Sequence, residues 1–244
     1  MNAESGLGFA HFIAQSDAVG KTLLVLLLAM SVLSWIIIAL KGLAQSSRGR
    51  RSRQFLDFFW NASSLDEVQG EIVAHGARDP FSHLAAHALQ ASLHHARYGA
   101  AKLAEAGSAS EFVTRTIKKV LDEETTRLEN GLTVLATVGA TAPFVGLFGT
   151  VWGVYHALVA IGVSGAGTLD KVAGPVGEAL IMTGLGLAVA IPAVVGYNVL
   201  VRANRVTLSR LDAFAYELHT FVSMGQPLQT GDEPAPVRTL RPAA

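Results

Sequence analysis

Three long stretches of the chain consist almost entirely of apolar residues, and they alternate with stretches that carry charges of both signs. The first uncharged run covers residues 22–40 and the second 132–163, while the third, 176–201, has Glu178 as its only formal charge. A helix of about 20 residues crosses the roughly 30 Å hydrocarbon core of a bilayer. The pattern therefore predicts an all-α membrane protein with three transmembrane helices.

Basic residues are distributed unevenly around these runs. The cluster RGRRSR follows the first run at residues 48–53, and three arginines follow the third, whereas the connection at 164–175 holds one lysine and one aspartate. The positive-inside rule then places the N-terminus outside and the C-terminus in the cytoplasm. The predicted order is an outer N-terminal segment (1–21), transmembrane helix (22–40), cytoplasmic helical domain (41–131), transmembrane helix (132–163), outer loop (164–175), transmembrane helix (176–201), cytoplasmic helix (202–224) and disordered tail (225–244).

The two cytoplasmic stretches carry helical patterns of apolar residues. In residues 112–128 these positions recur near a helical period, and no proline separates them from the second run, so a single helix is expected to continue into the membrane. The second and third transmembrane helices are therefore expected to extend into the cytoplasm as a helical bundle. After the third run, apolar residues recur in three-and-four steps, as in a helix that packs on another helix: Leu208, Leu211, Ala215, Leu218 and Val222.

Small residues form a nearly unbroken stripe along the second run, and the third run repeats the pattern more briefly. In lipid, helices associate through close packing and hydrogen bonds, and their contact faces are enriched in small residues. The stripe therefore predicts a helix contact face, with two alternatives open: packing within the chain, or self-association between copies. Its members are Gly139, Ala142, Gly146, Gly149, Gly153, Ala157 and Ala160, followed in the third run by Gly186, Ala190 and Ala193.

Few polar groups lie within the apolar runs. Glu178 follows Pro175 by three residues, which suits the first turn of a helix, but an intramembrane carboxylate also marks ion and proton paths. Isolated membrane threonines such as Thr150 and Thr183 usually bond their own helix four residues back. Since His156 is the only other group in the spans that titrates near neutral pH, a proton path through this chain would need groups from a second polypeptide.

Composition agrees with a membrane protein and excludes several classes of function. Half of the 244 residues are hydrophobic, and the mean hydropathy of +0.39 is typical of polytopic membrane proteins. With 19 basic and 19 acidic side chains, no nucleic-acid partner is expected. The chain has no cysteine for thiol chemistry and no motif for serine or phosphate chemistry, so neither an enzyme nor a cofactor is predicted.

Three histidines, His83, His87 and His94, share one face of a predicted helix. Such a trio is a possible metal site, but neither a cysteine nor the glutamate of an HExxH motif accompanies it. A solvated cytoplasmic face is the favoured interpretation, and no metal is predicted.

Two segments carry a family resemblance. The stretch APFVGLFGTVWG at residues 142–153 resembles the second-span signature of the ExbB, TolQ and MotA proton-channel proteins, and GPVGEALIMTGLGLAVAIPAVVGYN at 174–198 resembles their third span. Met182 and Gly184 replace alanines of the family pattern, which puts only local packing in doubt. Matching positions in the third span are Glu178, Thr183, Pro192, Tyr197 and Asn198.

The resemblance implies a homo-oligomer, expected to be a pentamer, in the bacterial inner membrane, with the outer segments in the periplasm. Its second and third spans would surround the membrane helices of two single-span ExbD-type subunits. Within the family the third span is more similar to ExbB than to TolQ, which implies a proton-driven motor that energises a TonB-type transducer and outer-membrane import. The alternatives are a TolQ-type subunit of the Tol-Pal system or a non-conducting scaffold among membrane lipids.

The resemblance also assigns roles to individual residues. Thr150, Thr183 and Glu178 are expected to line the proton path. Asn198 and Thr141 are further candidates for a pore or an interface. Helix packing is expected to involve Gly139, Gly146, Gly149, Gly153, Gly186, Pro143 and Pro192.

Overall fold

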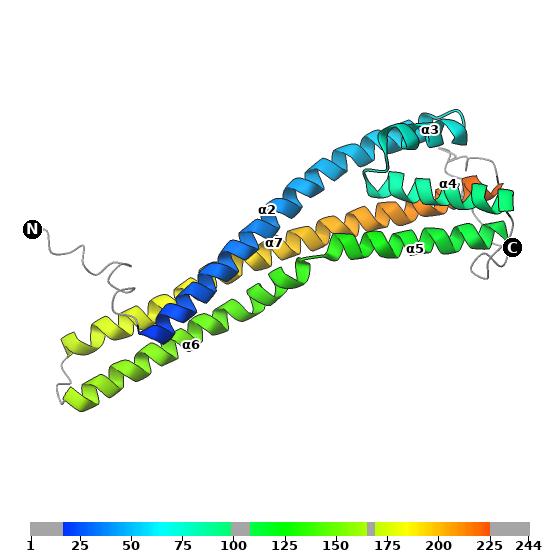
Figure 1. Cartoon of the computed structure of the whole chain (residues 1–244). Coiled ribbons are helices and arrows are strands. Elements are labelled where there is room, and N and C mark those ends of the chain that lie inside the picture. Colours follow the sequence, from blue (N-terminus) through cyan, green and yellow to red (C-terminus); the bar gives the residue numbers. More distant parts are fainter. Residues whose placement is uncertain (1–16, 99–107, 165–168, 225–244) are drawn as a thin grey trace, which may run out of the picture. The chain divides into compact units, whose positions relative to one another are not determined.

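The computed structural model describes residues 17–98, 108–164 and 169–224, and all regular secondary structure in these ranges is α-helical (Figure 1). This confirms the predicted all-α class. Within the described residues, three helical stretches are long and apolar enough to cross a membrane, and each overlaps one of the three predicted spans. The helices are α2 (Ala18–Asn61), α3 (Leu65–His75), α4 (Pro80–Tyr98), α5 (Ala109–Glu129), α6 (Leu132–Ser164) and α7 (Leu169–Met224).

The chain divides into two compact units. The first, which we call the span unit, comprises residues 1–50 and 125–207 and holds the three apolar runs. The second, the bundle unit, comprises residues 51–124 and 208–244. Helices α2, α5 and α7 contribute residues to both units, and each unit has its own buried core.

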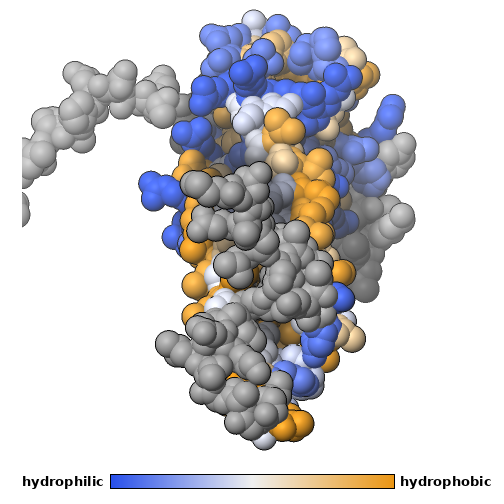
Figure 2. Space-filling view, turned by 90° about the vertical axis from the view of Figure 1, so that its left-hand side faces the viewer, coloured by the Kyte–Doolittle hydropathy of each residue, from blue (hydrophilic) through white to orange (hydrophobic). Residues whose placement is uncertain are grey.

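In the span unit, α2, α6 and α7 pack side by side (Figure 1). Their shared core includes Leu27 of α2, Leu135 of α6 and Met182 of α7, each at most 2% exposed. The outward faces are equally apolar: Phe144 is 70% exposed and Ile191 is 60% exposed. Such apolar surface appears in orange in Figure 2. Because contiguous apolar surface of this kind is rare on soluble monomers, lipid or other protein must cover it.

The bundle unit packs around aromatic and aliphatic side chains from five helices. The ring of Phe214 in α7 makes edge-on contacts with Phe55 and Phe59 of α2 and Phe81 of α4, at centroid distances of 5.0 to 6.5 Å. The predicted apolar seam of residues 208–222 is confirmed here, because its central members are buried in this core: Leu211, Ala215 and Leu218.

Side-chain caps begin several helices of the bundle unit, among them α4 and α3. Asp79 precedes α4, and its carboxylate accepts hydrogen bonds from the backbone N–H groups of Phe81 and Ser82 and from the hydroxyl of Ser52. Ser64 caps α3 because its hydroxyl accepts a hydrogen bond from the backbone N–H of Glu67, and serine is a residue type that helix N-caps favour. Both helices lie inside the stretch 41–131 that was predicted to be helical.

The expected continuous helix from residue 112 into the membrane is wrong. Helix α5 ends at Glu129 and α6 begins at Leu132, with Gly131 between them at φ 79°, a left-handed conformation that glycine adopts without strain. The break leaves the carbonyl of Leu128 without its helical partner. That carbonyl instead accepts hydrogen bonds from Lys41 Nζ of α2 and Asn204 Nδ2 of α7, both at 2.7 Å.

Other boundaries differ less. Helix α7 begins at Leu169, seven residues before the expected start of the third span, so most of the predicted loop 164–175 is helical. The same helix runs without interruption to Met224, through the predicted cytoplasmic helix. The predicted tail 225–244 lies outside the described residues.

Candidate functional site

Helices α6 and α7 approach so closely that their backbones touch at two glycines. A β-carbon added to Gly146 would lie 2.6 Å from the carbonyl oxygen of Met182 and 3.1 Å from the Cα of Thr183. One added to Gly186 would lie 2.6 Å from the carbonyl oxygen of Ala142. Since no real β-carbon fits at these distances, glycine is the residue type that this crossing accommodates.

The remaining glycines of the stripe also face α7 of the same chain. Gly149 lies against the side chain of Met182, Gly153 against Ala179, and Gly139 against Val194. Of the two alternatives that the stripe left open, these contacts correspond to packing within the chain. This face of α6 is therefore occupied by α7 of the same chain.

The close crossing brings two hydroxyl groups into contact. The Oγ1 atoms of Thr150 in α6 and Thr183 in α7 lie 2.5 Å apart, and both side chains are half-buried. The Thr150 hydroxyl also lies 3.0 Å from the carbonyl oxygen of Ala179 and 3.2 Å from that of Gly146. Two spans that are otherwise apolar thus share a small polar site, which we call the threonine pair.

Other membrane threonines behave differently. The hydroxyls of Thr137 and Thr141 each donate to the carbonyl four residues back in α6, at 2.8 Å, and both side chains are exposed. The own-helix bond was expected at Thr150 and Thr183: the Thr150 hydroxyl lies within reach of the Gly146 carbonyl four residues back, whereas the Thr183 hydroxyl meets Thr150 instead. Asn198 is likewise exposed on α7. The structure therefore does not bring Thr141 or Asn198 to the threonine pair.

Three further predicted residues lie within the long helices. Pro143 and Pro192 are half-buried in the interiors of α6 and α7. Glu178 belongs to α7, but its side chain lies outside the described part of the structure. Its place in a proton path stays a prediction.

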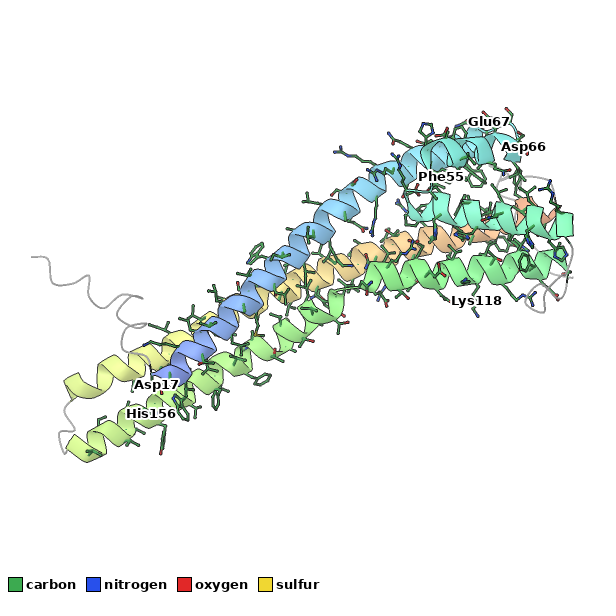
Figure 3. The ribbon with its side chains drawn as sticks, viewed as in Figure 1. Asp17, Phe55, Asp66, Glu67, Lys118 and His156 are labelled. Atoms are coloured by element: carbon green, nitrogen blue, oxygen red, sulfur yellow. The ribbon has the colours of Figure 1, made fainter. Side chains whose placement is uncertain are left out.

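A second polar cluster in the span unit involves residues that the sequence did not connect. The indole N–H of Trp152 donates to the Asp17 carboxylate at 2.7 Å, and the backbone N–H of Gly20 donates to its other oxygen, also at 2.7 Å. These two hydrogen bonds, that from Gly20 first, hold the pKa of Asp17 below its usual value. Figure 3 shows Asp17 beside His156, whose ring lies 4.6 Å from that of Trp152 between centroids.

The histidines of α4 lie in the bundle unit. His83 Nδ1 is 3.1 Å from Glu124 Oε1, and the rings of His83 and His87 meet edge-on at 4.6 Å, whereas His94 is exposed. Among the described residues, no three histidine, cysteine or acidic side chains are placed so that they could hold a metal ion.

Comparison with known proteins identifies the family. The model of the MotA/TolQ/ExbB proton channel family matches residues 77–213, more than half of the chain. The chain belongs to the MotA/TolQ/ExbB family. It is 41% identical over 231 residues, 91% of each chain, to the biopolymer transport protein ExbB of Xanthomonas campestris pv. campestris (strain B100). It is 40% identical to the ExbB of Neisseria meningitidis serogroup A, over 80% of this chain and 88% of that one.

The predicted resemblance to ExbB is confirmed by these relatives. The Tol-Pal system protein TolQ of Pseudomonas aeruginosa is more distant, at 31% identity over 86% of this chain and 90% of its own. Family membership makes the chain a membrane protein of a proton-channel family. Both threonines of the pair lie inside the matched region.

The sequence predicted the members of the threonine pair but not their contact. The MotA/TolQ/ExbB signatures identified Thr150 and Thr183 separately, one in each span. Which faces of two helices meet depends on their relative rotation, and the glycine stripe indicated a contact face without saying which helix occupies it. No local pattern linked Asp17 to Trp152, because 135 residues separate them.

Proposed function

We propose that the chain is the ExbB-type subunit of a motor that uses the protonmotive force to energise a TonB-type transducer and, through it, import across the outer membrane. The observation that carries this proposal is the threonine pair, a hydroxyl site between two apolar helices of a proton-channel family member. Identity of 40 to 41% to two ExbB proteins supports the assignment to ExbB. The chain acts as a channel and motor subunit rather than as an enzyme.

The proposed topology places the chain in the bacterial inner membrane with its N-terminus in the periplasm. The RGRRSR cluster after the first span and the arginines after the third lie on the cytoplasmic side. Residues 41–131 and 202–224 are then cytoplasmic, and residues 1–21 and 164–175 are periplasmic. The continuous helices α2 and α7 support this arrangement, since each runs out of an apolar span into a charged segment.

The proposed assembly is a homo-oligomer, with five copies expected, around two single-span ExbD-type helices. The glycine stripe is occupied by α7 of the same chain, so copies and partner helices meet other faces. Large exposed apolar side chains on α6 and α7 supply these faces, among them Phe144, Phe148, Leu187 and Ile191. The outward face of α2 meets lipid.

The threonine pair suits contact with a partner's carboxyl group. A hydroxyl donates a hydrogen bond to an ionised carboxylate and accepts one from a protonated carboxyl, so it serves both states without a buried charge of its own. A fixed charge would favour one state strongly, because charges interact strongly in a low-dielectric site. In this proposal the partner carries the proton, and Glu178 contributes a further group to the path.

A direct test replaces the ExbB-type subunit of a host strain with this chain. We expect it to restore uptake of a ferric siderophore, to lose that activity when a protonophore collapses the proton gradient, and to co-purify with an ExbD-like subunit. Co-elution with a TolR-like subunit, without restored uptake, would instead favour the TolQ-type function. If neither subunit co-purifies, and the contacts of the chain with other membrane proteins do not change when the proton gradient is collapsed, the chain is a scaffold.

A further inference from the structure

We propose that the two threonines of the pair have different roles. Thr183 is the group that exchanges hydrogen bonds with the partner's carboxyl, and Thr150 is a positioning residue that keeps the Thr183 hydroxyl available for that exchange. This inference rests on the proposed function, because it assumes that a carboxyl group of a partner helix reaches the site.

The surroundings of Thr150 favour one direction for the hydrogen bond between the two hydroxyls. A hydroxyl has one hydrogen, and three oxygens lie within reach of the Thr150 hydroxyl: the carbonyls of Ala179 and Gly146 and the hydroxyl of Thr183. A carbonyl accepts but never donates. Both threonine hydroxyls are satisfied when Thr150 donates to a carbonyl, of which that of Ala179 is nearer, and accepts from Thr183.

The Ala179 carbonyl explains why Thr183 turns toward α6. In an α-helix this carbonyl already accepts the backbone N–H of Thr183, four residues on. It is also the acceptor that a helical threonine at position 183 would normally use for its own hydroxyl. Because Thr150 occupies the carbonyl's second lone pair from the neighbouring helix, the Thr183 hydroxyl is kept from the own-helix bond that Thr137 and Thr141 make.

The result is one anchored hydroxyl and one that can turn. While Thr183 donates to Thr150, its lone pairs are free to accept from a protonated carboxyl. When that carboxyl is ionised, the Thr183 hydrogen rotates from Thr150 toward the carboxylate. This exchange turns one C–O bond and breaks no covalent bond, and Thr150 keeps its carbonyl partner throughout.

The test is a double-mutant cycle measured on the assembled complex. We expect Thr183→Val to lower proton-gradient-dependent uptake per complex by about 10- to 100-fold, the range for losing a hydrogen bond to a charged group. Thr150→Val frees the Ala179 carbonyl, so Thr183 turns back to its own helix and uptake falls about tenfold. Because Thr150 acts through Thr183, the double variant is expected to match Thr183→Val.

Conservative variants separate a hydroxyl role from a shape role. Thr150→Ser keeps the hydroxyl and is expected to retain uptake, whereas Thr150→Val keeps the shape and loses it. Thr137→Val, which removes an exposed hydroxyl bonded to its own helix, is the matched control and is expected to behave as wild type. If a valine variant fails to co-purify with the partner, Thr150→Ala and Thr183→Ala carry the same comparison.

Several outcomes would overturn the inference, and they differ from a failure of the proposed function. A double variant that loses the product of the two single effects would mean that Thr150 meets the carboxyl itself. Loss of uptake in Thr150→Ser together with normal uptake in Thr150→Val would mean that shape matters and the hydroxyl does not. Normal uptake in both valine variants would contradict the hydroxyl path as a whole, and absence of uptake with the wild-type chain would contradict the proposed function.

Discussion

The helices of the span unit and those of the bundle unit contact one another through residues of opposite size. In the bundle unit, helices are held together by large rings that meet around Phe214. In the span unit, α6 and α7 meet where side chains are missing, at Gly146 and Gly186. Water drives large apolar side chains into a core, but lipid offers no such drive, so membrane helices gain from close backbone contact instead.

The two units also satisfy buried polar groups differently. In the bundle unit a carboxylate meets polar side chains, as Asp79 accepts from the hydroxyls of Ser52 and Ser82. At the threonine pair of the span unit the partners are hydroxyls and backbone carbonyls. A neutral hydroxyl is cheaper to bury than a charge, which suits a site between two largely apolar helices.

The largest effect is expected from adding a side chain where α6 and α7 cross at glycine. Gly146→Ala places a β-carbon against the Met182 carbonyl and is expected to push α6 and α7 apart, lowering the yield of folded complex about tenfold or more. Gly184→Ala is the matched control, because nothing lies within 4 Å of its β-carbon position and alanine favours a helix over glycine. Yield is measured as partner-bound chain after purification. Equal yields for Gly146→Ala and Gly184→Ala would mean that close backbone contact does not hold the span unit together, contrary to the comparison above.

A smaller effect is expected from the bundle unit's core. Phe214→Ala removes the ring at the centre of the aromatic contacts and is expected to destabilise this unit by about 3 to 5 kcal/mol. Hydrogen exchange of the full-length protein, compared between α4 and α6, shows which unit has lost stability. We expect faster exchange in α4 and little change in α6. Equal acceleration in both helices would mean that the two cores are not separate.

Asn204→Leu is expected to cost less, because it removes one of two donors to the Leu128 carbonyl while Lys41 keeps the other. Because the carbonyl stays bonded to Lys41, we expect a loss of about 0.5 to 1.5 kcal/mol, the net value of a typical hydrogen bond. Thermal unfolding in nanodiscs measures this loss. Thr207→Val, which removes a hydroxyl bonded to its own helix and to Gln45, serves as the comparison. A Tm unchanged by Asn204→Leu would show that Lys41 alone satisfies the break.

The smallest effect is expected at Asp17. Its pKa is lowered in the folded chain, so the stabilisation it gives is present above the ordinary value of 3.8 and is lost as pH falls through the lower folded value. We expect Trp152 fluorescence to titrate below pH 3.8 in the wild type and to lose this step in Asp17→Asn. Trp152→Phe identifies the signal. A wild-type midpoint above 3.8 would contradict the hydrogen-bonded carboxylate.

Hydropathy was sufficient to predict three apolar helices, because a long uncharged run has few alternatives to a membrane helix. It did not predict the break at Gly131. The absence of proline suggested continuity, and a glycine taken by itself does not reveal a left-handed conformation. The Asn130–Gly131 pair was the available signal, since asparagine and glycine often end helices.

The site was predictable only in part. The family signatures identified Thr150 and Thr183, but the contact between them depends on how α6 and α7 are rotated about their axes. That rotation follows from many packing contacts over both helices, of which Gly146 and Gly186 are the tightest. The Asp17–Trp152 bond was beyond the sequence because hydrogen bonds between distant residues leave no periodic pattern.

The hydrogen bonds at the α5–α6 break have a consequence for biogenesis. Lys41 is synthesised 87 residues before Leu128, and Asn204 follows Leu128 after another 76. At roughly 5 to 20 residues per second, the carbonyl emerges about 4 to 17 seconds after its first donor and waits a similar time for its second. In a nascent chain with two spans inserted, the Leu128 carbonyl therefore has Lys41 as its only side-chain donor. Synthesis of the third span then supplies Asn204, the second donor.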